Sequence, residues 1–163
     1  VHPFFQKLAN FHQLASRGLC RSCLSTMFLA PRDVLFHTFQ VAFRMYFVEG
    51  GWLKYQQDVL IKDVTAPEWF SEPVLWTKWL FLGTMQATTP VELVSIASER
   101  FQEVMKGHPE TNNLVKRYAS RYIEMLNHTP ENHLSDLCQD RDAIPIVKSV
   151  RNPEEVKTHF FTK

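Results

Sequence analysis

The stretch over residues 31–51 constrains the fold more than any other part of the chain. Its large apolar side chains recur every three or four residues, the spacing that gathers side chains on one face of an α-helix. Pro31 suits a first helical turn, and Gly50-Gly51 supplies the left-handed exit that often ends a helix. The aromatic face of such a helix consists of Phe36, Phe39, Phe43 and Phe47. We therefore predict a buried central helix over this stretch.

Apolar residues at helical intervals also occupy most of the remaining sequence. We predict helices over residues 2–17, 19–30, 74–86 and 91–106, then from 109 or 111 to 126, followed by a short helix from 129 and a last one from 152. Residues 52–62 continue a helical period, although a short strand over residues 59–61 is the alternative. The five glycines offer few hairpin turns, which argues against an all-β protein.

These segments predict an all-α fold. We expect a single domain over residues 1–163 with seven or eight helices, arranged as an irregular bundle or as a HEAT-like stack of helical hairpins. The helical repeat of such a stack is suggested by Thr89-Pro90 and Thr129-Pro130, which lie 40 residues apart. Since the sequence begins at Val1 and not at Met, we interpret it as a fragment of a longer protein.

The charge and the cysteine content indicate which cellular environment to expect for the protein. With 18 basic and 17 acidic residues the formal net charge is +1, which gives no electrostatic reason to expect an anionic membrane as partner. No apolar stretch approaches the roughly 20 residues that span a bilayer. Three cysteines, Cys20, Cys23 and Cys138, cannot all pair with one another and indicate reduced thiols. We therefore expect an intracellular protein of the cytoplasm or nucleus.

Two of the cysteines form the strongest candidate for a metal site. Cys20 and Cys23 have the C-x-x-C spacing that supplies half of many zinc centres, and His12 and His37 flank them in the sequence. The other half of a tetrahedral site is unconvincing, because no second C-x-x-C and no paired histidine motif follows. We therefore predict no metal and no cofactor, with zinc at these four residues as the alternative.

The sequence contains no familiar catalytic motif. A G-x-S-x-G elbow, an H-E-x-x-H pair, a Walker loop and a Rossmann fingerprint are all absent from it. We therefore predict that the chain is not an enzyme. The alternative is an unfamiliar site around His37 and Arg44, which the central helix would place on one polar strip where they could bind a carboxylate or a phosphate.

The leading functional hypothesis is a protein–protein interaction domain, a scaffold or adaptor within a larger intracellular protein or complex. Its partner would be another protein or peptide, and we expect Trp69 and Phe70 to bind it, because large aromatic residues often anchor interfaces. The alternative is a nucleic-acid-associated helical domain that uses a modest basic surface of Lys116, Arg117 and Arg121. Neither hypothesis identifies the partner.

Overall fold

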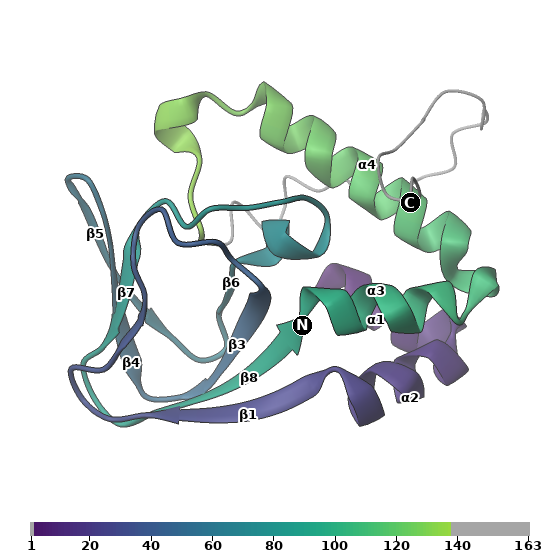
Figure 1. The fold of residues 1–163 in the computed structure, drawn as a ribbon, viewed down its shortest axis with the longest axis horizontal. Coiled ribbons are helices and arrows are strands. Elements are labelled where there is room, and N and C mark those ends of the chain that lie inside the picture. Colours follow the sequence, from purple (N-terminus) through teal and green to yellow (C-terminus); the bar gives the residue numbers. More distant parts are fainter. Residues whose placement is uncertain (1, 138–163) are drawn as a thin grey trace.

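The computed structural model describes residues 2–137 of the 163-residue chain. In this part, eight β-strands form two four-stranded sheets and four α-helices flank them (Figure 1). The predicted all-α bundle or HEAT-like stack is therefore wrong, because the centre of the molecule is built from strands. Cys138 and the helix predicted from residue 152 lie outside the described residues.

The strands of both sheets are antiparallel. One sheet has the order β1 (Leu24–Leu29), β8 (Val91–Ala97), β3 (Arg44–Gly50) and β6 (Trp69–Phe70), and the other has the order β2 (Val34–Phe36), β7 (Thr84–Ala87), β4 (Trp52–Gln57) and β5 (Leu60–Thr65). The chain changes sheet at every connection between successive strands except β4 to β5, so it winds around one core as a jelly roll. The buried side chains of this core include Met45, Val48, Leu53, Met85 and Leu93.

The helices gather at one end of the roll and along one of its sides (Figure 1). Helices α1 (Pro3–Phe11), α2 (Gln13–Ser22) and α3 (Ser98–Lys106) pack together at that end, and α4 (Asn112–His128) runs back over the roll. Short 3-10 helices form at η1 (Glu72–Leu75), η2 (Pro109–Thr111) and η3 (Glu131–His133). No helix in this part of the chain is long and apolar enough to cross a bilayer.

The predicted central helix does not form. Residues 31–51 instead contain β2, a loop and β3, and they end in the turn that leads to β4 in the other sheet. The phenylalanines do not share one face, since Phe36 is buried while Phe39 and Phe43 are 78% and 63% exposed. In β3, Tyr46 and Val48 are buried, as aromatic and β-branched residues are in many strands. A short apolar run therefore fits either structure, and its periodicity alone could not decide between them.

Of the other predicted helices, some form in the structure and others are replaced by strands. The start of the first predicted helix is confirmed by α1, and the helix predicted from residue 109 or 111 is confirmed by α4. Residues predicted as helical form β1, β7 and β8 instead, and β5 confirms the strand alternative near Leu60. Thr89-Pro90 connects β7 to β8 rather than capping a helix, so the repeat predicted from it is wrong.

Two adjacent glycines at the turn from β3 to β4, where the chain passes from one sheet to the other, provide a test of this fold. Gly51 has φ +86°, and a Cβ on it would lie 2.9 Å from the Cα of Val91 and still closer to the carbonyl oxygen of Pro90. A Cβ on Gly50 would meet nothing within 4 Å. We expect Gly51→Ala to lower the free energy of unfolding by about 2 kcal/mol or more, measured by urea denaturation. Gly50→Ala is the matched control, and equal losses from both substitutions would contradict this geometry of the β3–β4 turn.

Candidate functional site

The last described segment returns from α4 to the roll and closes over it (Figure 1). We call residues 134–137, which follow η3, the strap. Leu137 forms an isolated antiparallel bridge with Phe70 of β6, and the backbone N–H of Ser71 donates to the Asp136 carbonyl oxygen at 2.6 Å. The strap is therefore held to the edge of the first sheet by its own backbone.

The side chain of Asp136 fills a polar site inside the roll. Its carboxylate is fully buried, with Asp136 0% exposed, and it accepts four hydrogen bonds. The backbone N–H groups of Leu82 and Gly83 donate to Oδ2 at 2.8 and 2.9 Å, and the Tyr55 hydroxyl donates to the same atom at 2.8 Å. The Trp79 indole N–H donates to Oδ1 at 2.7 Å. We call these four donors the anion cradle, since a site made only of donors is suited to a negative charge.

The cradle depends on a glycine at its base. A Cβ on Gly83 would lie 2.5 Å from the carbonyl oxygen of Gln56 and 2.6 Å from the Tyr55 ring, so only glycine lets this segment lie so close to β4. The carboxamide of Gln57 lies beside the cradle and links Tyr55 to the strap. It accepts from the Tyr55 hydroxyl and donates to the Leu134 carbonyl oxygen, both at 2.8 Å.

Burial makes the charge of Asp136 costly. Desolvation raises the pKa of its carboxyl above the usual range, and the hydrogen bonds from Trp79, Tyr55 and the two backbone N–H groups offset this rise in part. Desolvation and the neighbouring Asp136 charge also raise the pKa of Tyr55. The Tyr55 hydroxyl lies 2.8 Å from both Asp136 Oδ2 and Gln57 Oε1, but its single proton can be donated to only one of them. A protonated Asp136 would itself donate to the Tyr55 oxygen, and the Tyr55 proton would then be donated to Gln57.

A second buried carboxylate lies one residue from the strap contact. Glu72 of η1 accepts hydrogen bonds from the Tyr118 hydroxyl of α4 at 2.9 Å and from the indole N–H groups of Trp69 and Trp76, each at 3.3 Å. His2 Nε2 lies 3.0 Å from Glu72 Oε2, although its angle is not that of a good hydrogen bond. The Phe4 N–H donates to His2 Nδ1, which leaves Nε2 as the ring nitrogen that faces Glu72. Glu72 thus joins the starts of α1 and η1 to α4.

The residues predicted to bind a partner are next to this site. Trp69 and Phe70 form β6 and are 4% and 0% exposed, rather than lying in an open loop. Trp69 donates to Glu72, and Phe70 pairs with Leu137 of the strap. Their predicted role in binding a partner remains a prediction, and the structure gives them contacts within the fold.

The basic residues predicted for nucleic acid lie on one helix. Lys116 and Arg117 are exposed on α4, and Arg121 is half-buried on the same helix. Their role also remains a prediction. The alternative catalytic pair, His37 and Arg44, does not lie on one helix as predicted. His37 is exposed in the loop after β2, whereas Arg44 is the first residue of β3 and donates to Ser95 Oγ at 3.2 Å.

The C-x-x-C pair lies at the end of α2. Cys20 is exposed and Cys23 is buried, and both are free thiols. Burial, with a smaller contribution from the Glu103 charge, raises the pKa of Cys23 to about 11, which keeps it protonated at neutral pH. Within residues 2–137, no three His, Cys, Asp or Glu side chains are grouped so that they could hold a metal ion, so the structure does not bring His12 and His37 to this pair as zinc ligands.

The cradle itself could not be predicted from the sequence. Tyr55 and Asp136 are 81 positions apart, and Gly83 comes from a third segment. Two of the four donors are backbone N–H groups, which carry no residue signature. The nearest available sign is a single acidic residue between the apolar Leu134 and Leu137, a pattern shared by many surface turns.

Comparisons with known proteins place the fold. No family model matches the chain, and no curated protein matches it. Among solved structures, the N-terminal domain of a transcriptional regulator from Streptomyces coelicolor is 25% identical, with a TM-score of 0.59 over 73% of this chain and 87% of that one. The C-linker/CNBHD of zELK channels, crystallized in the presence of cAMP, is 19% identical, with a TM-score of 0.62 over 75% of this chain and 60% of that one. A cyclic nucleotide-binding-like protein from Brucella abortus is 18% identical, with a TM-score of 0.53 over 61% of this chain and 90% of that one.

The chain therefore has the jelly-roll fold of cyclic-nucleotide-binding domains. The predicted helical scaffold or adaptor is wrong, because the chain is not a helical bundle. Its structural neighbours are described instead as a domain of a transcriptional regulator, a domain of channels and a cyclic nucleotide-binding-like protein. The helical nucleic-acid domain offered as the alternative fails with the same all-α fold. These neighbours are described as parts of regulators and channels, not as enzymes.

Removing the charge of Asp136 without changing its size tests the hydrogen bonds of the cradle. In Asp136→Asn the side-chain NH2 group would face donors, because the cradle offers it N–H and O–H groups. We expect the free energy of unfolding at neutral pH to fall by about 1–3 kcal/mol, measured by urea denaturation. Glu131→Gln, on the exposed η3, is the isosteric control and should change little. A loss no larger than that of the control would count against the site.

The raised pKa of Asp136 predicts how this contribution varies with pH. The native carboxyl has the higher pKa, so the folded state binds more protons between the ordinary aspartate pKa of about 3.9 and the native value. The stability of the native chain relative to Asp136→Asn should therefore fall as pH rises through this window and then become constant. Urea denaturation of both proteins from about pH 4 to 8 would measure it, and a difference that increases with pH would contradict the assignment.

Proposed function

We propose that this chain is a regulatory ligand-binding domain whose anion site is occupied by its own strap. The observation that carries the proposal is the buried Asp136 carboxylate on the N–H groups of Leu82 and Gly83. Two successive backbone N–H groups and two side-chain donors form a site that would suit a phosphate group as well as a carboxylate. Asp136 thus takes the position that an anionic ligand would need.

The fold comparisons support a ligand-binding role and suggest the class of ligand. Two of the neighbours are described with cyclic nucleotides, one as a cyclic nucleotide-binding-like protein and one as crystallized in the presence of cAMP. A cyclic nucleotide carries one negative phosphate, which could accept from the same donors. Because Asp136 already uses these donors, the strap and such a ligand would compete for one site.

The contacts of the strap suggest how its release would affect helices α1 and α4. Ser71 holds the strap through its backbone N–H, and the adjacent Glu72 contacts both His2 at the start of α1 and Tyr118 of α4. Displacement of Asp136 would free Ser71 and the end of α4 together. A signal at the cradle would therefore reach two helices through η1.

The remaining functional statements belong to the same proposal. A regulatory domain of this kind does not need catalysis, and we propose that the chain acts without being an enzyme. We propose an intracellular location, supported by the free thiols of Cys20 and Cys23. The protein partner would be the part of the parent protein, or of its complex, that contacts α1 or α4.

The competition can be tested with Asp136→Ala, which removes the carboxylate and leaves the donors. Isothermal titration of the whole chain with cAMP and, separately, with inorganic sulfate should show binding to this variant at least about tenfold tighter than to the native chain. Glu131→Ala removes an exposed carboxylate near the strap and should behave as the native chain does. If Asp136→Ala binds neither anion, or if the native chain binds cAMP equally well, the proposal is wrong.

A further inference from the structure

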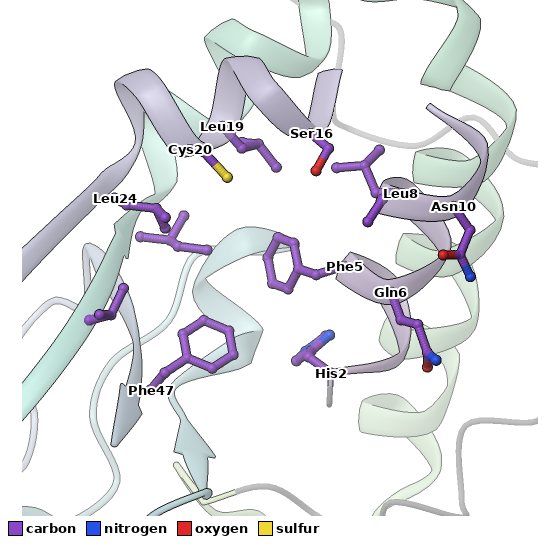
Figure 2. Close-up of a pocket in the computed structure, with 13 residues that line it drawn as sticks. His2, Phe5, Gln6, Leu8, Asn10, Ser16, Leu19, Cys20, Leu24 and Phe47 are labelled. Atoms are coloured by element: carbon purple, nitrogen blue, oxygen red, sulfur yellow. The ribbon is translucent and has the colours of Figure 1, made fainter. Parts of the chain in front are cut away.

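A pocket unrelated to the cradle lies between the N-terminal helices and the first sheet (Figure 2). It has a volume of about 500 Å³ and is lined by residues of α1, α2, β1, β3 and β8. This size falls within the range of roughly 300–1,000 Å³ that is usual for small-molecule sites. Neither the proposed cradle nor the strap contributes a residue to it.

The walls of the pocket are apolar. Phe5 of α1 and Phe47 of β3 meet edge to face, with ring centroids 5.8 Å apart, and Figure 2 shows Phe5 projecting toward Phe47. Leucines from both helices and side chains of the sheet complete the walls: Leu8, Leu19, Leu24, Val94 and Ile96. An apolar cavity of this size is a favourable place for apolar atoms and a poor one for water.

Charge is absent from the lining. None of the residues that line the pocket is Asp, Glu, Lys or Arg. His2 lines it, but its Nδ1 accepts from the Phe4 N–H and its Nε2 faces Glu72, so both nitrogens are directed at other partners. The polar groups at the exposed edge are neutral, namely Gln6, Asn10, Ser16 and Cys20. A charged ligand would lose its hydration here without gaining a counter-charge.

We propose that this pocket binds a neutral, largely apolar small molecule with its polar group at the edge formed by Gln6, Asn10 and Ser16. Apolar burial supplies the binding energy, and the neutral edge accepts a hydroxyl or carbonyl group. The ligand would join α1 and α2 to the sheet. Since the lining is separate from the cradle, this site does not depend on the proposed function, and Asp136→Ala should leave it intact.

A pair of dyes that differ in one charged group tests the proposal on the whole chain. N-phenylnaphthylamine is neutral and fluoresces in apolar sites, and anilinonaphthalene sulfonate has the same ring system with a sulfonate. We expect the neutral dye to bind saturably at one site, to be displaced by dodecanol, and to bind at least about tenfold tighter than the sulfonate. Absence of saturable binding, or tighter binding of the sulfonate, would overturn the proposal.

Substitutions then locate the site. Ser16→Phe and Leu24→Trp add bulk at two lining positions, the second of them partly exposed, and each should weaken the neutral dye at least about tenfold. Gln13→Phe adds the same bulk on an exposed position of α2 that does not line the pocket, and it should have no effect. Circular dichroism would establish that each variant is folded. Unchanged binding by both filled variants would place the dye elsewhere and contradict the proposal.

A measurement on the native chain supports the same assignment without any substitution. Cys20 lies at the exposed edge of the pocket, so a bound dye should slow its alkylation by iodoacetamide. Peptide mass spectrometry would follow Cys20 separately from the other cysteines. An alkylation rate that is independent of dye concentration would contradict binding at this edge.

Discussion

The structure depends on the burial of the Asp136 carboxylate, which among residues 2–137 is held by hydrogen-bond donors and not by a cationic side chain. Four donors from two segments converge on this carboxylate of the strap: Tyr55 comes from β4, and Trp79, Leu82 and Gly83 come from the segment before β7. A buried charge is tolerated only where its hydrogen bonds are satisfied, so each segment holds the others in position. The cradle is therefore a structural tie and an anion site at once, and loss of the strap would leave backbone donors unpaired.

The tie extends from the roll into the helices. Ser71 contacts the strap, and Glu72, the next residue, contacts His2 and Tyr118. The start of η1 thus has contacts to the strap, through its N-cap Ser71, and to α1 and α4, through Glu72. The apolar pocket lies on the other side of His2, between α1 and the sheet. Under the proposed function, a ligand in either site would act on the same helices.

Helix α4 could be predicted from the sequence and the two sheets could not, because the length of an apolar pattern decides how clearly it indicates one structure. In α4 the helical period is sustained over seventeen residues, whereas the strands are short apolar runs that fit either structure. Gly50-Gly51 does end an element, but the positive φ of Gly51 belongs to a turn between the two sheets and not to the end of a helix. The cradle was beyond prediction because its donors are partly backbone and because Tyr55 and Asp136 meet only in the folded chain. Trp69 and Phe70 were selected as partner-binding residues, and they lie beside the strap.

The central claim is that the strap carboxylate occupies the backbone N–H groups of Leu82 and Gly83. Amide hydrogen exchange, followed residue by residue by NMR, tests it most directly in the native chain and in Asp136→Ala. The account predicts that these two amides are protected in the native chain and exchange at least about tenfold faster in the variant, while the amide of Val94 in the β3–β8 ladder is unaffected. Equal exchange of Leu82 and Gly83 in both proteins would show that Asp136 does not hold the cradle.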